Sequence, residues 1–122
     1  MIAKVMIVNV INMVEVELPI HIHQHKQLFI SPIRISLLQK IKQVGSLNSA
    51  AKELSISYQN AWTIVDEMNT IASQPLVLKQ RGGNGGGGAK LSNYGEFVLK
   101  EYSYIEKQVN DFLKLLNYEI NF

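Results

Sequence analysis

The sequence predicts a mainly α-helical domain with a small β component, and two observations carry this prediction. Apolar residues recur at intervals of three and four across 31–71 and again across 93–116, which is the period of an amphipathic helix. Between these ranges, six of the eight glycines lie within 82–88. A glycine run does not sustain a helix or a regular strand, because glycine has the most backbone freedom to lose on folding.

Residues 1–30 are predicted to form an N-terminal β-strand segment. The range 2–11 is rich in isoleucine and valine, which favours a strand. The range 14–23 alternates apolar and polar residues, as a half-buried strand does. Pro19 lies within it, so this strand is expected to be bent or to lie at an edge.

Three helices are predicted next, each marked by a capping residue. Ser31 and Pro32 supply an N-cap and a first helical residue, and Gly45 ends this helix. A short second helix at 46–54 and a third at 58–71 follow it. The remaining caps are Ser46 or Asn48 for the second helix and Ser57 for the third. The apolar positions expected to be buried in the three helices are Ile33, Leu37, Leu38, Ile41, Val44, Ala50, Ala51, Leu54, Ala61, Ile64, Val65, Met68 and Ile71.

A β-hairpin and a long helix complete the chain. Short strands at 76–81 and 89–91 lie on either side of the glycine run, and the last helix extends from about Asn93 to Leu116. Its apolar residues follow the heptad spacing of a dimerisation seam. The seam consists of Val98, Tyr102, Ile105, Val109, Phe112 and Leu116. Leu99, Leu113 and Leu115 add a second apolar edge, so one stripe could cover the domain and the other a partner chain.

Composition and charge exclude several classes of function. Without cysteine there is no disulfide, no thiol nucleophile and no cysteine-ligated zinc. No paired catalytic carboxylates and no nucleophile–histidine–acid set are apparent, so we expect neither an enzyme nor a cofactor. The apolar start is interrupted by Asn9 and Asn12 and is unlike a signal peptide or a membrane span, which predicts a cytoplasmic protein without a membrane partner.

Charge is distributed unevenly along the chain, although the net charge is only +2. Residues 31–92 contain seven Lys and Arg against three Asp and Glu, whereas residues 93–122 contain three against five. A basic middle and an acidic end suggest two surfaces with different roles.

The second and third helices, joined by a three-residue turn, are typical of a helix-turn-helix, and the glycine-tipped hairpin after them would be its wing. Hydrogen-bonding side chains in the first turns of the third helix suit base edges in the major groove of double-stranded DNA, and Glu67 shares their face. Basic and small residues on the wing, 79–90, suit phosphates, and its tip would lie along the DNA backbone or enter the minor groove. The candidate DNA-binding residues are Ser57, Tyr58, Gln59, Asn60, Thr63, Lys79, Arg81, Gly83, Asn84, Gly85 and Lys90.

Other interpretations stay open. The spacing of Gly83, Gly85 and Gly88 matches a dinucleotide fingerprint, but a strand rather than a helix follows it. The long helix could make the chain a protein–protein interaction module. His21, His23 and His25 would share one face of an extended strand, which could bind a metal or a small molecule, although a polar edge is the simpler interpretation. Trp62 is expected to pack at the helix edge and to touch Tyr58.

Two stretches of sequence resemble a known family. "GSLNSAAKELSISYQNAWTIVDEMN" (45–69) and "PLVLKQRGGNGGGGAKLSNYGE" (75–96) are similar to the DNA-binding domain of the ModE family of molybdate-responsive regulators. More distantly, they are similar to the LysR-type winged helix. The most specific parts are 56–62 and 82–89. The resemblance extends from about residue 27 to the long helix.

The resemblance implies an N-terminal strand, a winged helix-turn-helix and a long dimerisation helix. We therefore expect three parts, 1–30, 31–92 and 93–122, in a homodimer that binds double-stranded DNA. The family carries a lysine in the wing where this chain has Asn84, so one phosphate contact would be missing. Members of the family continue into molybdate-binding β-barrel domains, whereas this sequence ends at Phe122. Molybdate sensing is not carried over, and an effector would be bound by a separate protein.

Overall fold

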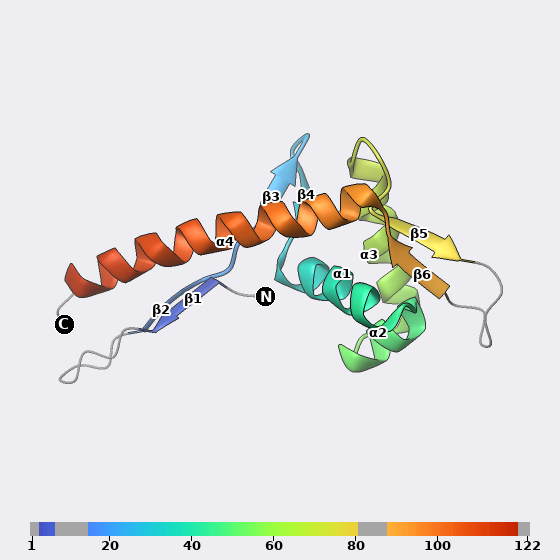
Figure 1. Ribbon diagram of the computed structural model, residues 1–122, viewed down its shortest axis with the longest axis horizontal. Coiled ribbons are helices and arrows are strands. Elements are labelled where there is room, and N and C mark those ends of the chain that lie inside the picture. Colours follow the sequence, from blue (N-terminus) through green and yellow to red (C-terminus); the bar gives the residue numbers. More distant parts are fainter. Residues whose placement is uncertain (1–2, 7–14, 81–87, 120–122) are drawn as a thin grey trace.

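The computed structural model describes residues 3–6, 15–80 and 88–119, and it describes side chains for 18–80 and 88–116. Figure 1 shows a long helix running the length of the molecule, with the shorter helices and a β-hairpin gathered at one end. The elements are β1 (Ala3–Met6), β2 (Glu15–Leu18), β3 (Ile22–Gln24), β4 (Gln27–Ile30), α1 (Pro32–Val44), α2 (Leu47–Glu53), α3 (Tyr58–Ile71), β5 (Val77–Gln80), β6 (Gly88–Leu91) and α4 (Asn93–Glu119). The predicted mainly α-helical fold with a small β component is confirmed.

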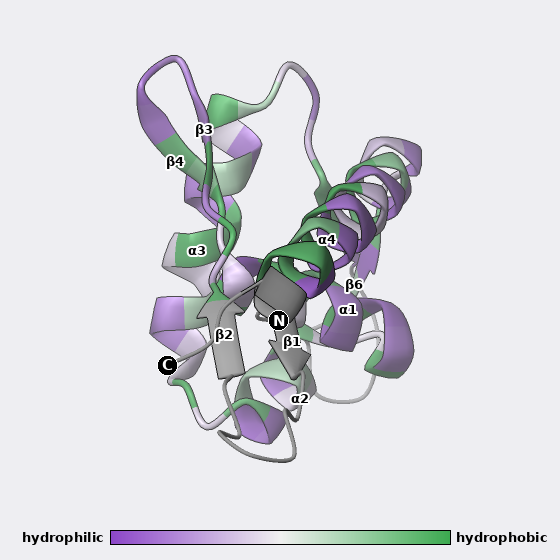
Figure 2. Ribbon diagram, turned by 90° about the vertical axis from the view of Figure 1, so that its left-hand side faces the viewer, coloured by the Kyte–Doolittle hydropathy of each residue, from purple (hydrophilic) through white to green (hydrophobic). Residues whose placement is uncertain are grey.

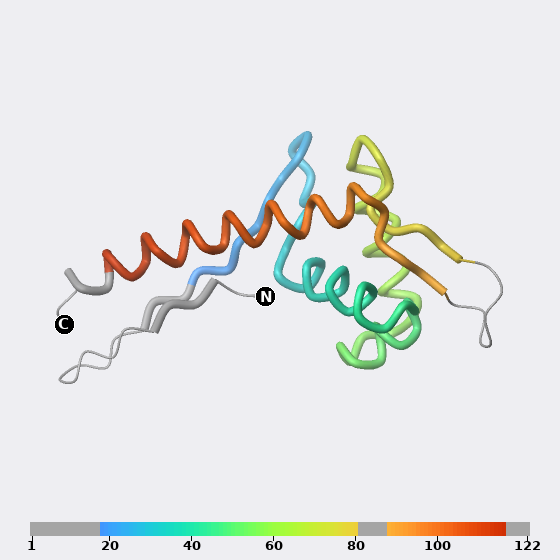
Figure 3. Tube along the Cα trace, in the orientation of Figure 1, coloured from blue at the N-terminus to red at the C-terminus, as the bar shows by residue number. Residues whose placement is uncertain are grey.

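The strands in the described ranges pair as antiparallel hairpins: β1 with β2, β3 with β4, and β5 with β6. β1 and β2 pack along α4. From the end of β2 the chain runs beside α4 and enters the β3–β4 hairpin, as the trace in Figure 3 shows. The predicted first strand is present at Ala3–Met6, and the rest of its predicted range, 7–11, lies outside the described residues.

The prediction of one strand over 14–23 was wrong. β2 ends at Leu18, and a second hairpin turns at His25 and Lys26, which have φ values of 53° and 63°. Left-handed backbone of this kind is expected of Asn or Gly, so the residue types gave no signal for the turn. Strand β4 was missed for the same reason. His25 therefore lies in the turn, and the three histidines do not share one extended strand.

The helix caps are as predicted. Ser31 Oγ accepts from the N–H of Arg34, and Gly45, at φ 68°, donates its N–H to the carbonyl of Ile41. Ser46, not Asn48, caps α2 by accepting from Ser49 N–H at 3.2 Å. The Ser57 hydroxyl caps α3, accepting from Asn60 N–H at 3.0 Å.

One hydrophobic core joins the helices to the β3–β4 hairpin. Hydrophobic residues gather where α1, α3 and α4 meet, whereas the tip of the hairpin is hydrophilic (Figure 2). Leu37, Leu38 and Ile41 of α1 are fully buried as predicted. Two other predicted core positions of α1, Ile33 and Val44, are instead exposed, at 42% and 39%. The buried face is displaced toward Ile35 and Arg34, because α1 packs against α2, β6 and α4 at once.

The start of α4 crosses the start of β5 at very close range. The Ser92 N–H donates to the carbonyl of Leu76 at 2.8 Å, and its hydroxyl donates to the carbonyl of Pro75 at 2.6 Å and accepts from Gly95 N–H at 3.0 Å. Gly95 is buried, and a Cβ added there would lie 2.3 Å from the carbonyl oxygen of Leu76. Glycine is therefore required at this crossing.

We expect Gly95→Ala to lower the free energy of unfolding by about 1–3 kcal/mol, because the new methyl group forces the wing strand and α4 apart. Urea denaturation followed by circular dichroism measures this change. Ser103→Ala, at an exposed position of the same helix, is the control and should leave stability nearly unchanged. Alanine is a better helix former than glycine, so a gain in stability at position 95 would show that the close crossing is absent in solution.

Candidate nucleic-acid interface

Helix α3 buries one face and exposes the other. Ala61, Val65 and Met68 point into the core, as the apolar pattern predicted, and Ile64 and Ile71 pack at its margin. The opposite face exposes Gln59, Asn60 and Thr63. The Thr63 hydroxyl donates to the carbonyl of Gln59 at 3.1 Å.

The charge on α3 changes halfway along the helix. Residues 58–65 contain no charged side chain, whereas Asp66 and Glu67 follow directly. Both acids lie beside a shallow depression of about 320 Å³, which Gln27 and Thr70 also line. A polyanion would therefore meet a neutral, hydrogen-bonding surface over the first two turns of α3 and a repulsive one beyond them.

Arg34 fixes the position of α3, and the sequence analysis missed it. Its side chain is buried, and Nη1 donates to the carbonyls of Leu28 at 2.7 Å and Phe29 at 3.2 Å. Nη2 forms an ion pair with the carboxylate of Glu67. Glu67, predicted to share the groove-facing surface, remains half-exposed there, but its carboxylate is paired with Arg34. An arginine within the apolar pattern of α1, three residues after the cap, was the available signal.

The wing is held to the rest of the domain from two sides. Asn69, near the end of α3, accepts from the N–H of Leu76 at 2.8 Å and donates to the carbonyl of Val77 at 3.1 Å. On the other strand, the Ala89 N–H donates to the carbonyl of Gly45 at 3.1 Å, at the turn between α1 and α2. The direction of the wing therefore follows that of α1 and α3.

The two lysines predicted to bind phosphate lie on opposite faces of the wing. Lys79 pairs with Ala89 across the hairpin and Lys90 pairs with Leu78, and side chains of paired residues share a face. Arg81, Gly83, Asn84 and Gly85, the other predicted wing contacts, lie outside the described residues.

Lys79 lies on the side of the wing nearest to α3. Its Nζ is 3.6 Å from the centroid of the Trp62 ring. The edge of Tyr58 meets the same ring, with centroids 6.1 Å apart and planes at 87°, so the predicted contact between these aromatic residues is present. Trp62 itself packs at the margin of the core, as expected.

The seam predicted on α4 is largely used by the domain itself. Val98 and Tyr102 are buried in the core, and burial, together with the charge of Glu106, raises the pKa of Tyr102. Ile105 and Val109 pack against the same core, Leu116 is half-buried and Phe112 is 62% exposed. The part of the seam that remains open is thus its C-terminal end.

A second face of α4 exposes large apolar side chains. Phe97, Tyr104 and Leu115 are 53%, 62% and 68% exposed, and their spacings of 7 and 11 residues place them on one side of the helix. With Phe112 they form what we call the exposed ridge. Elsewhere on the surface of α4, a hydrogen bond between Lys107 and Asp111 raises the pKa of the lysine and lowers the pKa of the acid.

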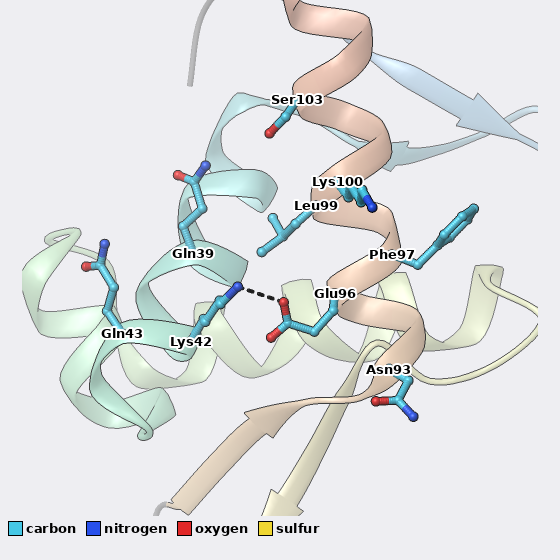
Figure 4. Close-up of a pocket in the computed structure, with 9 residues that line it drawn as sticks. All are labelled: Gln39, Lys42, Gln43, Asn93, Glu96, Phe97, Leu99, Lys100 and Ser103. Atoms are coloured by element: carbon cyan, nitrogen blue, oxygen red, sulfur yellow. Dashed lines mark hydrogen bonds and ion pairs between the residues drawn. The ribbon is translucent and has the colours of Figure 1, made fainter.

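A groove of about 1020 Å³ separates α1 from α4. Figure 4 shows Leu99 directed toward α1 and Phe97 on the far side of α4. An ion pair between Lys42 and Glu96, 2.7 Å long, crosses the groove. Its lining is mostly polar and includes Gln39 and Gln43, and no nucleophile–base pair is present among the described side chains that line it.

The described residues contain no group of three or more histidine, cysteine or carboxylate side chains that could hold a metal ion. Among the helices in the described ranges, none is long and apolar enough to cross a membrane.

Helices α2 and α3, the β5–β6 hairpin after them and their exposed polar face define a winged helix-turn-helix domain. No family model matches the chain. It is 41% identical over 91 residues to the transcriptional regulator ModE of Haemophilus influenzae, a match that covers 75% of this chain and 36% of that protein. Over the same length it is 38% identical to the DNA-binding transcriptional dual regulator ModE of Escherichia coli K12, covering 75% of this chain and 35% of that protein.

A third relative is the molybdenum-pterin-binding protein MopB of Rhodobacter capsulatus, 40% identical over 88 residues, which cover 69% of this chain and 33% of that protein. Over three quarters of its own length the chain is therefore similar to the ModE transcriptional regulators. It spans about a third of the length of the curated relatives that it matches.

We expect Arg34→Met to lower the free energy of unfolding by about 2–4 kcal/mol, because it leaves two buried carbonyls and a carboxylate without their donor. Glu67→Gln should cost less than about 1 kcal/mol, since the side chain of Glu67 is 51% exposed and glutamine keeps an acceptor. Urea denaturation compares the two variants. Equal losses of unfolding free energy in the two variants would mean that Arg34 stabilises the fold through its ion pair and not through the carbonyl contacts.

Proposed function

We propose that this chain binds double-stranded DNA sequence-specifically and regulates transcription, with the first turns of α3 in the major groove and the wing along the DNA backbone. One observation carries the proposal: the first two turns of α3 expose hydrogen-bonding side chains and no charge, with the ammonium group of Lys79 beside them. The relatives named as transcriptional regulators support it. The same names support the proposal that its role is not catalytic.

The chemistry of the exposed α3 face suits base edges. The side-chain amides of Gln59 and Asn60 match the donor and acceptor of adenine in the major groove, and the methyl group of Thr63 can contact a thymine methyl. Because the Ser57 hydroxyl caps α3, its role on DNA would be limited to the backbone around the helix start, where N–H groups favour anions.

Charge gives the docking a direction. Asp66 would repel phosphates from the second half of α3, where Glu67 is paired with Arg34, whereas Lys79 would attract them toward the first half. The helix would therefore enter the groove by its N-terminal end, which is the end that helix-turn-helix proteins use to contact bases.

The exposed ridge supports a homodimer built on α4. A soluble monomer rarely leaves Phe97, Tyr104, Phe112 and Leu115 open on one helix. A second copy that lays its own α4 alongside would cover both ridges and the open end of the predicted seam. Two-fold pairing would present two α3 helices to half-sites of a roughly palindromic operator.

Selection of bound sequences from random duplex DNA tests this function. We expect one enriched motif with two related half-sites, and an affinity that falls steeply as salt rises because phosphate contacts release counterions. Binding to a protein partner through α4, the other role open to this chain, would give no enrichment. That result, with binding indifferent to salt, would refute the proposed function.

We expect Gln59→Ala to weaken binding to the selected site by about 1–3 kcal/mol while binding to random duplex changes little. Fluorescence anisotropy with both DNAs measures the difference. Gln43→Ala removes an exposed amide from α1 and serves as the control. Equal losses on the two DNAs would show that Gln59 does not contact bases.

For assembly, we expect a dimer in sedimentation at micromolar concentration and without DNA. Phe112→Asp combined with Leu115→Asp should give a monomer, because each ridge would then bury charge. The control is Lys114→Asp, which makes the same change in net charge at an exposed neighbouring position and should stay dimeric. A wild-type chain that sediments as a monomer would contradict the dimer.

A further inference from the structure

We propose that Trp62 is a positioning residue that holds the ammonium group of Lys79 between the wing and α3, so that the two elements bind one DNA phosphate as a unit. This inference rests on the proposed function, since it names how that interface is assembled. It concerns a residue whose sequence pattern indicated only packing.

The contact joins two elements that are separate in sequence. Trp62 belongs to the second turn of α3 and Lys79 to β5, and Nζ lies 3.6 Å from the ring centroid, within the range of a cation–π interaction. Tryptophan offers the strongest such face among the aromatic side chains.

The ring itself has little freedom to move. Trp62 packs at the margin of the core, and the edge of Tyr58 meets its ring from the preceding turn. A long lysine side chain on an exposed strand would otherwise sample many rotamers, each costing entropy when a phosphate is bound. Because the fixed ring already restricts the lysine side chain, less side-chain entropy is lost when a phosphate binds.

An aromatic partner orients the lysine without neutralising it. Within the described part of the chain, the ion pairs join Arg34, Lys40, Lys42 and Lys107 to acids, and none involves Lys79. A carboxylate in place of the ring would cancel the charge that a phosphate needs. The indole leaves the positive charge available on the side of the ammonium group that faces away from the ring.

Lys90 provides the internal contrast. It is exposed on the other face of the same hairpin, with Leu78 opposite it, and no aromatic contact is recorded for it among the described residues. The wing therefore offers one lysine anchored to α3 and one that is not, and only the anchored lysine should depend on Trp62.

The first experiment needs no DNA. Trp62 is the chain's single tryptophan, so tryptophan fluorescence reports on the surroundings of this one ring. Lys79→Ala should raise the acrylamide quenching constant of Trp62 by uncovering one face of the ring, whereas Lys90→Ala should leave it at the wild-type value. In NMR spectra, the ε-methylene protons of Lys79 should be shifted upfield by the ring, and Trp62→Leu should abolish that shift while Trp62→Phe keeps part of it.

The second experiment measures the salt dependence of binding to duplex DNA. Lys79→Gln should reduce the slope of log affinity against log salt by about one unit, and Trp62→Leu should reduce it similarly although it removes no charge. The double variant should lose no more than either single variant, because the two residues act together. Trp62→Phe should recover part of the slope.

The two experiments separate failure of the inference from failure of the function. Quenching by acrylamide that is the same in Lys79→Ala and wild type refutes the contact, whatever the DNA results. A slope unchanged by Trp62→Leu, or losses that add in the double variant, refutes the positioning role even if the contact exists. If the wild-type chain binds no duplex DNA, the proposed function and the role on phosphate are both overturned, while the contact itself is still judged by fluorescence.

Discussion

The buried guanidinium group of Arg34 is the contact on which the placement of the candidate interface depends. It binds the carbonyls of Leu28 and Phe29 at the end of β4 and the carboxylate of Glu67 on α3. Three segments therefore meet at one planar cation whose donors have a fixed geometry. A lysine would offer a point charge without that geometry. The β3–β4 hairpin and α3 would then no longer be held in a fixed orientation by the same group. The exposed face of α3 is presented at a defined angle because its other side is fixed in this way.

A second set of contacts extends that rigidity to the wing. Asn69 joins the end of α3 to β5, and Gly45 joins the α1–α2 turn to β6. Each contact satisfies backbone groups that a short hairpin would otherwise expose to water at its base. The wing is consequently rigid where it leaves the domain, and its strands approach α3 on the side of Trp62. The wing and α3 can form a single binding surface only when both are fixed to the same core.

Local signals in the sequence predicted the elements well, because caps and glycine stops act within a few residues. Ser31, Gly45 and Ser57 define helix ends by hydrogen bonds to near neighbours. Features set by tertiary packing escaped prediction. The rotation of the buried face of α1 away from Ile33 depends on three neighbouring elements, and the left-handed turn at His25 breaks the preference of its residue type. The exposed polar face of α3 was predicted from the pattern, whereas the contact between Lys79 and Trp62 joins two distant elements and left no signal in the sequence.

Only Ser92 separates the last strand of the wing from the first residue of α4. Hydrogen bonds and the close crossing at Gly95 leave little slack between them. The helix has 27 residues, and at 1.5 Å per residue it is about 40 Å long. A rigid rod of this length turns a tilt of about 5° at its first residue into a displacement of about 3.5 Å at its far end. The packing of Val98, Tyr102 and Ile105 against the core opposes such a tilt, so the angle between α4 and the wing is set both at Gly95 and along the core.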